Sequence, residues 1–192
     1  MPTFNTNDLL TTLDKDVHGF LQRTAQLSAM DTKLLLQQPA ANKWSAIQVV
    51  EHLNSYNRYY LAHIEQAMQQ QGARYAASKT FGPGWLGEYF TKSMYSDVQR
   101  KKEITNKMKA PKDHRPLAAL DAKKVMEEFV AGEQKLLQLI ATARSTNIAK
   151  VRVPISIARW IKISMGDTFR FLVAHQERHF LQISNTLAAV AQ

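Results

Sequence analysis

The chain of 192 residues contains no cysteine. This absence excludes disulfides, cysteine zinc clusters and a thiol nucleophile on the chain. It does not assign a compartment, because oxidising and reducing compartments both contain cysteine-free proteins. A glycine-rich phosphate loop is also missing: the turn Gly82-Pro-Gly84 lacks the Lys-Ser/Thr ending of such loops, so a nucleotide cofactor is not expected.

Long hydrophobic runs are absent as well. No apolar run approaches the ~18 residues of a transmembrane helix, which predicts no membrane partner. The first ten residues, MPTFNTNDLL, lack the basic and apolar regions of a secretory signal. We therefore expect a cytoplasmic protein.

Glycine and proline are few, with 7 and 6 residues, and they are clustered. An all-β chain needs many turns, so this scarcity favours an all-α fold. Apolar residues recur at three- and four-residue steps in four segments, which predicts four long helices. Their expected ranges are 7–36, 45–72, 121–143 and from 157 or 165 to 191.

Local signals mark several of these boundaries. Asn5 or Asn7 can cap the first helix, and Ser45 with Gln48 has the spacing of a capping box, preceded by Trp44 as a hydrophobic staple. Prolines interrupt residues 73–118, where we expect only a shorter helix over 86–107. The segment 151–154 is the only strand-like stretch that we predict.

These elements predict one domain over residues 1–192. Four long amphipathic helices, with an extended connection between the second and third, are typical of a four-helix bundle with a long crossover.

Two histidines, His175 and His179, are four residues apart on the last predicted helix. One helical turn places both imidazoles on the same face, ~6 Å apart, which suits two ligands of one divalent metal. His52 lies beside the apolar stripe of the second helix, and helix packing could bring it to the pair. Three imidazoles with one open position are typical of catalytic metal sites.

Spacing alone leaves open that these histidines are ordinary core residues. For the other three, solvent exposure or ordinary packing is the preferred interpretation. His63 is eleven residues beyond His52, which corresponds to a rise of ~16 Å, and His18 and His114 have no partner pattern.

Three stretches of sequence carry a family resemblance. Trp44-Ser-Ala-Ile-Gln-Val-Val-Glu-His-Leu53 resembles the start of the second helix of DinB/YfiT-like proteins, and residues 166–183 resemble their last helix. Lys109-Ala-Pro-Lys112 is similar to the crossover of the DinB-like domain 2 branch. The resemblance covers the whole length, in the right order.

The resemblance implies a four-helix bundle that holds a divalent metal, commonly zinc or nickel. Its ligands are one histidine of the second helix and two of the fourth, which here are His52, His175 and His179. Some similar proteins are thiol S-transferases that use bacillithiol or mycothiol, and others are called hydrolases. A small-molecule substrate is therefore expected, with a low-molecular-weight thiol as one candidate cosubstrate.

Several other residues are candidates for supporting such a site. Tyr56 lies one turn after His52, and Gln182 lies three residues after His179. Glu133 falls on the buried stripe of the third helix, where it would orient a ligand or move protons, or simply be a satisfied core carboxylate. Arg178 leaves its helix ~100° from His179, which favours a structural salt bridge.

The net charge of +9 is concentrated in two segments. Residues 92–124 contain ten basic and four acidic residues, and residues 144–170 contain six and one. An anionic substrate, an acidic partner or a merely solvated face would each explain them. No nucleic-acid-binding motif appears, so nucleic acid is not favoured.

Two functions from different classes remain open. One is a metal-dependent hydrolase or thiol transferase. The other is a non-catalytic metal-binding or stress-response module with a basic surface. Similar proteins are often dimers, so a homodimer is a state to test.

Overall fold

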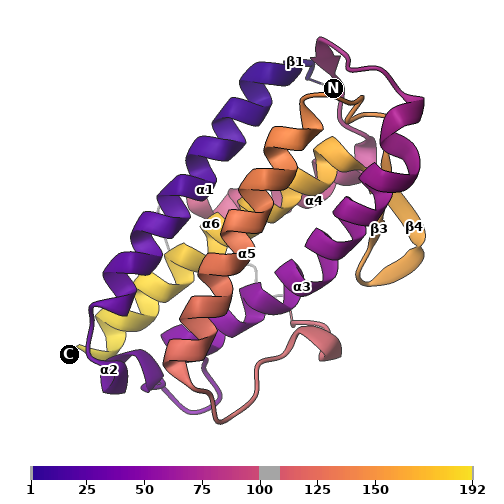
Figure 1. Cartoon of the computed structure of the whole chain (residues 1–192). Coiled ribbons are helices and arrows are strands. Elements are labelled where there is room, and N and C mark those ends of the chain that lie inside the picture. The colour runs from indigo at the N-terminus through magenta and orange to yellow at the C-terminus, as the bar shows by residue number, and fades with distance from the viewer. Residues whose placement is uncertain (1, 100–108, 192) are drawn as a thin grey trace.

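The computed structural model describes residues 2–99 and 109–191 (Figure 1). Side chains are described for these residues except 96–99. It is mostly helical, which confirms the predicted all-α class. Four long helices lie side by side (Figure 1): α1 (Thr6–Ser28), α3 (Ala46–Gln71), α5 (Ala122–Ala143) and α6 (Met165–Val190).

Shorter elements connect these helices. They are α2 (Thr32–Leu36), α4 (Trp85–Gln99), the 3-10 turns η1 (Gly72–Arg74) and η2 (Lys112–His114), and four strands: β1 (Phe4–Asn5), β2 (Thr80–Phe81), β3 (Arg152–Ile155) and β4 (Ala158–Ser164). Strand β1 pairs antiparallel with β2, and β3 pairs antiparallel with β4.

The first predicted helix is wrong at its C-terminal end. Asn5 caps α1 as expected, because its side chain accepts hydrogen bonds from the backbone of Asn7 and Asp8. The helix ends at Ser28, however, and Asp31 caps the separate helix α2. Ala29 and Met30 are apolar and no glycine or proline marks the break, so the sequence was interpreted as one continuous helix.

The second predicted helix begins as expected. Ser45 and Gln48 form a reciprocal capping box at the start of α3, and Gly72 caps its end. The third predicted helix is also confirmed, since Asp121 caps α5 and the helix ends at Ala143.

The fourth predicted helix begins at Met165, and the alternative start at Ile157 is wrong. Residues 158–164 instead form β4, which pairs with β3 in a hairpin on the flank of α3 (Figure 1). The expectation that 151–154 is the only strand-like stretch is therefore also wrong. Most of β4 is exposed, so its sequence lacks the alternation of buried and exposed residues that marks a strand.

The predicted short helix over 86–107 starts at Trp85 as α4, and residues 100–108 lie outside the described part of the chain. Helix α4 packs on α6, and Gly87 makes the contact close, because a Cβ there would lie 2.2 Å from the side chain of Asp167.

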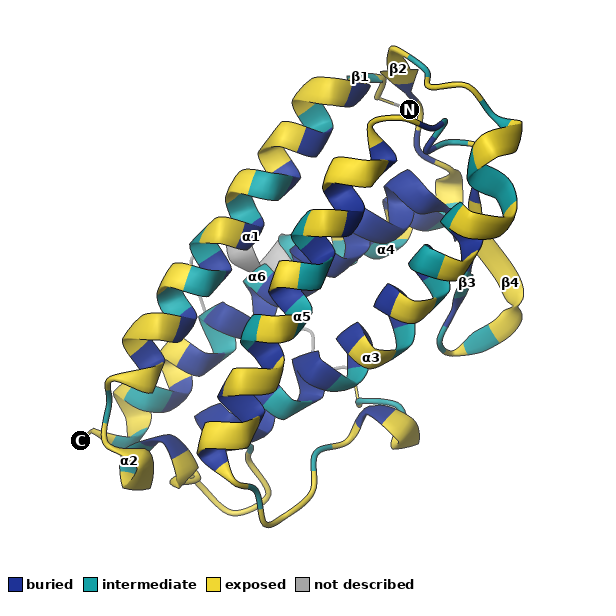
Figure 2. Ribbon diagram, in the orientation of Figure 1, coloured by how far each residue is buried: buried dark blue, intermediate teal, exposed yellow. Residues whose placement is uncertain are grey.

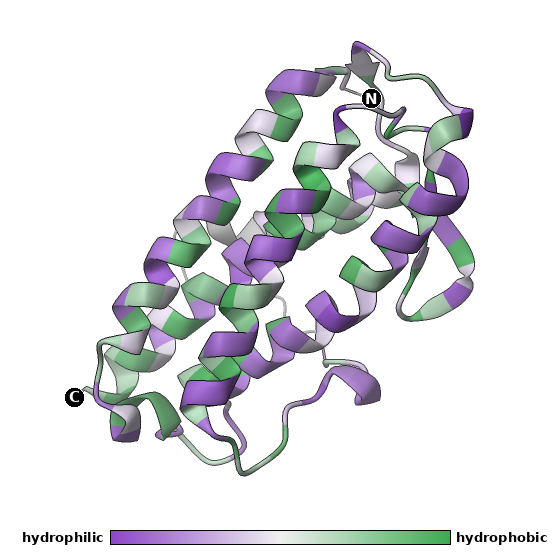
Figure 3. Cartoon of the chain, in the orientation of Figure 1, coloured by the Kyte–Doolittle hydropathy of each residue, from purple (hydrophilic) through white to green (hydrophobic). Residues whose placement is uncertain are grey.

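The core lies between the long helices, whose inner faces are buried (Figure 2) and carry most of the hydrophobic residues (Figure 3). Phe20 of α1 stacks on Phe180 of α6 with ring centroids 5.3 Å apart, and Phe129 of α5 completes this contact. The first half of α6 is buried on every side, from Met165 to Gln176, because α4 covers the side that the other helices leave open. Polar side chains on α6 are consequently held inside the protein.

Candidate metal centre

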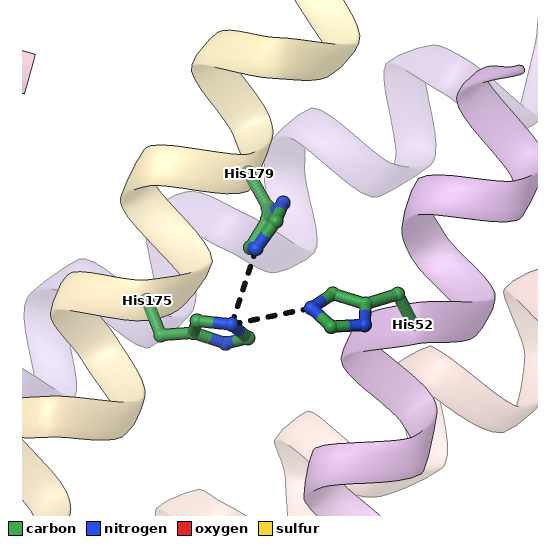
Figure 4. Close-up of side chains that lie close together, drawn as sticks. All are labelled: His52, His175 and His179. Atoms are coloured by element: carbon green, nitrogen blue, oxygen red, sulfur yellow. Dashed lines mark hydrogen bonds between the residues drawn. The ribbon is translucent and has the colours of Figure 1, made fainter. Parts of the chain in front are cut away.

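Three buried histidines meet between α3 and α6 (Figure 4). The Nε2 atoms of His52 and His175 are 3.3 Å apart, and those of His179 and His175 are 3.1 Å apart. One ligand nitrogen from each ring lies within 4.8 Å of the other two. The structure therefore brings together all three residues that the sequence singled out.

The helices explain this convergence. His175 and His179 leave the same face of α6 because they are one turn apart. His52 lies on α3, two turns after the capping box of Ser45, and α3 packs against α6. Trp44 precedes the cap and packs on His52 with ring centroids 5.1 Å apart.

Hydrogen bonds on the far side of two rings assign their tautomers. His52 Nδ1 is 2.6 Å from the backbone oxygen of His114, so Nδ1 must carry the proton and donate it. His179 Nδ1 is 2.8 Å from Oε1 of Gln182 and is a donor in the same way. Both Nε2 atoms are therefore left with a lone pair that faces His175.

Burial keeps these rings neutral. Desolvation lowers the pKa of His52 to about 4, despite the opposing effect of its bond to His114. Desolvation also lowers the pKa of His175 and of His179 well below the usual value, and the neighbouring histidines add to this effect. Neutral imidazole is the form that binds metal ions.

The donor set fits a divalent cation. Two nitrogens bound to one tetrahedral zinc at ~2.0–2.1 Å are about 3.3 Å apart, close to the two separations seen here. A single proton on His175 Nε2 would have to be shared between the lone pairs of His52 and His179. A metal cation can instead accept the Nε2 lone pairs of all three histidines. The outer nitrogens of His52 and His179 bond to a backbone oxygen and an amide, as is typical of metal-binding histidines, whereas His175 Nδ1 has no partner among the described residues.

The triad, meaning His52, His175 and His179, borders an open cleft of about 1560 Å³. Aromatic side chains form much of its wall beside the triad, and Tyr56 and Phe171 both contact His175, with ring centroids 4.3 and 5.6 Å from it. A small molecule in this cleft can therefore reach the triad.

Two of the expected supporting residues lie beside the triad. Gln182 bonds to His179, as described above, and the ring of Tyr56 contacts those of His52 and His175. Desolvation raises the pKa of the Tyr56 hydroxyl, so this group stays protonated and is a donor rather than a base. Arg178 is buried and also lines the cleft.

Glu133 lies elsewhere. Its Oε1 accepts hydrogen bonds from Asn57 Nδ2 at 2.9 Å and Gln176 Nε2 at 2.6 Å, and the residue is fully buried. Desolvation raises its pKa to about 8, although both hydrogen bonds oppose the shift. The contacts match the interpretation of Glu133 as a core carboxyl and give it no contact with a triad ring among the described residues.

Sequence reasoning missed the part played by His114. Its backbone oxygen orients His52, its ring stacks on Tyr56 at 4.0 Å, and its Nδ1 lies 3.0 Å from Ser55 Oγ. It is buried by these contacts. Because 62 residues separate it from His52, no helical spacing could have indicated the pairing.

The remaining two histidines lie apart from the triad. His18 is exposed on α1 beside Asp14, and His63 bonds to the backbone oxygen of Tyr59 one turn before it. Neither is in the lining of the cleft.

A sequence model of the DinB superfamily matches residues 17–183. The chain belongs to the DinB superfamily. The match includes all of α3 and α6 as far as residue 183, and therefore all three histidines of the triad. Searches among curated proteins and among solved structures returned no match. Family membership and the buried triad are together compatible with a metal-binding protein.

Among the described residues, no helix combines the length and hydrophobicity needed to cross a membrane.

Proposed function

We propose that this DinB superfamily member is a metal-dependent enzyme in which His52, His175 and His179 bind one divalent ion, zinc or nickel. The observation that carries the proposal is the pair of imidazole lone pairs, on His52 and His179, that face the third ring in a buried site. Turning lone pairs toward one another is unfavourable unless a cation or proton lies between them.

When bound, such an ion supplies Lewis acidity, which acidifies and polarises a small molecule in its coordination sphere. The chain contributes the rest. His114 and Gln182 hold two rings in their binding tautomers, and the ring of Tyr56, whose hydroxyl stays protonated, contacts His52 and His175. The aromatic wall excludes water on one side, which strengthens electrostatic interactions at the triad.

Two reaction classes fit this arrangement, namely hydrolysis of a small ester or amide and transfer of a thiol to a small electrophile. The chain has no cysteine, so in the second case the sulfur would come from a low-molecular-weight cosubstrate.

We further propose that residues 1–192 form one domain, with α1, α3, α5 and α6 as a four-helix bundle and the segment between α3 and α5 as its crossover. A cytoplasmic location and a homodimeric state belong to the same proposal, and light scattering after size-exclusion chromatography tests the second.

The alternative is a non-catalytic binding module in which the metal is structural. The observation that favours it is the exposed stretch of β4, where Arg159 and Lys162 lie near a tryptophan, Trp160, that is 83% exposed. Exposed aromatic and basic residues together are typical of interaction surfaces.

Metal titration tests the proposal directly. Metal-free protein competes with a chromogenic chelator for zinc and for nickel, with His175→Ala as the test variant and His18→Ala as the matched control. We expect wild type and the control to bind one ion and His175→Ala to bind it more than about 100-fold more weakly, beyond the loss typical of an outer-shell partner. Equal binding by all three proteins would contradict the ligand assignment.

Activity separates the two functions. Ester hydrolysis and thiol transfer to a small electrophile are measured before chelation, after chelation and after zinc is restored. An enzyme loses activity on chelation and regains it with zinc, whereas a binding module shows no turnover in any state.

A further inference from the structure

The cleft that borders the triad has an uneven chemical lining. Of the described residues, it includes four cationic side chains and no aspartate or glutamate. The four cations are Lys43, Lys109, Arg115 and Arg178. A surface with both signs of charge would be expected from a chain that contains 16 acidic residues, so the absence of carboxylates from this lining sets the cleft apart.

The cations border the triad from separate segments. Lys43 lies in the loop before α3, close in sequence to Trp44, which packs on His52. Lys109 and Arg115 lie on either side of η2, whose His114 binds His52 through its backbone oxygen. All three side chains are exposed and so can meet a ligand in solution.

The other wall of the cleft is apolar. Tyr56 and Tyr60 follow His52 on α3 at successive turns, and Phe171 precedes His175 on α6. Because α3 and α6 run in opposite directions (Figure 1), these aromatics gather on one side of the triad, with Tyr60 and Phe171 centroids 5.8 Å apart. Phe90 of α4 extends the wall, 6.0 Å from Phe171.

We infer that the cleft binds an organic anion that also carries an apolar group. The anionic group lies toward the lysines and Arg115, the apolar group lies against the aromatic wall, and the triad lies between them. This inference names the substrate class of the proposed enzyme. It rests on the proposed function in one respect, namely that the reacting bond of the substrate lies at the triad. A cation, or a small anion without an apolar group, would contact only part of the lining favourably.

Three probes test the inference by calorimetry on the full chain: 3-phenylpropane-1-sulfonate, 3-phenylpropan-1-amine and propane-1-sulfonate. Sulfonates coordinate metal ions weakly, so the measurement reports the cleft rather than the metal. We expect the aryl sulfonate to bind at least about tenfold more tightly than either other probe, with an affinity that falls as salt is added. Equal affinity for the amine would overturn the charge assignment, and equal affinity for propane-1-sulfonate would overturn the apolar subsite.

Lysine substitutions locate the anionic end. The variants are Lys43→Gln, Lys109→Gln and the double variant, and Lys79→Gln is the control because Lys79 is exposed but lies outside the cleft lining. We expect each single cleft variant to weaken binding of the aryl sulfonate roughly threefold and the double variant roughly tenfold. An unchanged affinity in the double variant would overturn the inference.

The same titrations distinguish this inference from the proposed function. Probe binding is measured with zinc-loaded and with metal-free protein. Anion-selective binding in a chain that binds neither zinc nor nickel would refute the metal-dependent enzyme and support the anion cleft. Zinc binding without selectivity among the probes would refute the anion cleft alone.

Discussion

Two buried polar clusters meet on α3 and α6, one of them with a member from α5, and they differ in what their polar atoms face. On α6 the neighbours His175 and Gln176 point to different clusters: His175 meets His52, and Gln176 meets Asn57 and Glu133. The carboxyl cluster, meaning Asn57, Glu133 and Gln176, forms hydrogen bonds among its own members, which leave Glu133 Oε2 and Gln176 Oε1 without a partner among the described residues. The triad borders a cleft, and the Nε2 atoms of His52 and His179 both face His175 there.

Convergence of acceptor atoms beside a cleft marks a candidate site more clearly than burial does. Burial perturbs the pKa of groups in both clusters, so a shifted pKa does not by itself identify a site. What distinguishes the triad is the convergence of acceptor atoms beside an open cleft.

Acid should destabilise the metal-free protein through the triad. Its histidines are neutral when folded, whereas the unfolded chain takes up protons below pH 6.5, so unfolding is favoured as the pH falls from 6.5 to about 4. The lowered pKa of His52 alone corresponds to a loss of about 3 kcal/mol of unfolding free energy over this range, at 1.36 kcal/mol per pKa unit. Urea unfolding at pH 7, 6 and 5 measures the slope.

The source of this acid sensitivity is tested by replacing one histidine at a time with glutamine. His52→Gln should reduce the dependence of unfolding free energy on pH, and His18→Gln, which changes an exposed side chain, should leave it as in wild type. If His52→Gln kept the full slope, the triad would not be the source of the acid sensitivity.

The carboxyl cluster should give a slope of opposite sign. Glu133 stays protonated in the fold up to about pH 8, whereas the unfolded chain ionises it above about pH 4.5, so stability should fall as the pH rises between these values. The isosteric variant Glu133→Gln carries no such proton. We expect its unfolding free energy to rise by on the order of 3 kcal/mol relative to that of wild type between pH 5 and 8, at the same 1.36 kcal/mol per pKa unit.

Glu127→Gln is the matched control for this measurement, because Glu127 lies on the same helix with its side chain 64% exposed. Parallel pH dependence of wild type and Glu133→Gln would show that Glu133 is ionised in the fold.

Zinc should stabilise the protein through only one of the clusters. At free zinc about 100 times the dissociation constant, a site present only in the folded state adds about 2.7 kcal/mol. We expect this gain in wild type and in Glu133→Gln, and a much smaller one in His175→Ala, as measured by thermal unfolding with and without zinc. A full gain in His175→Ala would remove the distinction between the two clusters.

The smallest effect concerns the start of α3, which supports both clusters. Ser45→Ala removes the side-chain oxygen that accepts from Gln48 N and should cost about 1 kcal/mol. Ser145→Ala, beyond the end of α5, is the control for loss of a serine side chain outside an N-cap. An unfolding midpoint equal to that of wild type would show that the capping box adds nothing to stability.

Sequence patterns predicted the helices best where local chemistry decides the structure. The caps at Asn5, Ser45 and Asp121 depend on a side chain and the backbone within three residues of it, so composition and spacing suffice to find them. The pair His175 and His179 was also predictable from local sequence, because residues one helical turn apart lie on the same face of the helix. The break after Ser28 and the hairpin strand β4 were missed, because an apolar stripe and an exposed strand gave no local contrast there.

By itself, then, the sequence determined the helical class, the caps and the shared face of two histidines, since all three follow from contacts within one or two turns. Only the tertiary structure decided that His52 completes the triad, that His114 orients it from a distant loop, and that Glu133 belongs to a separate cluster. These outcomes depend on how α3, α5 and α6 pack and on where the connection before α5 lies. Contacts between residues far apart in the chain are set by the sum of many packing interactions, which no short stretch of sequence carries.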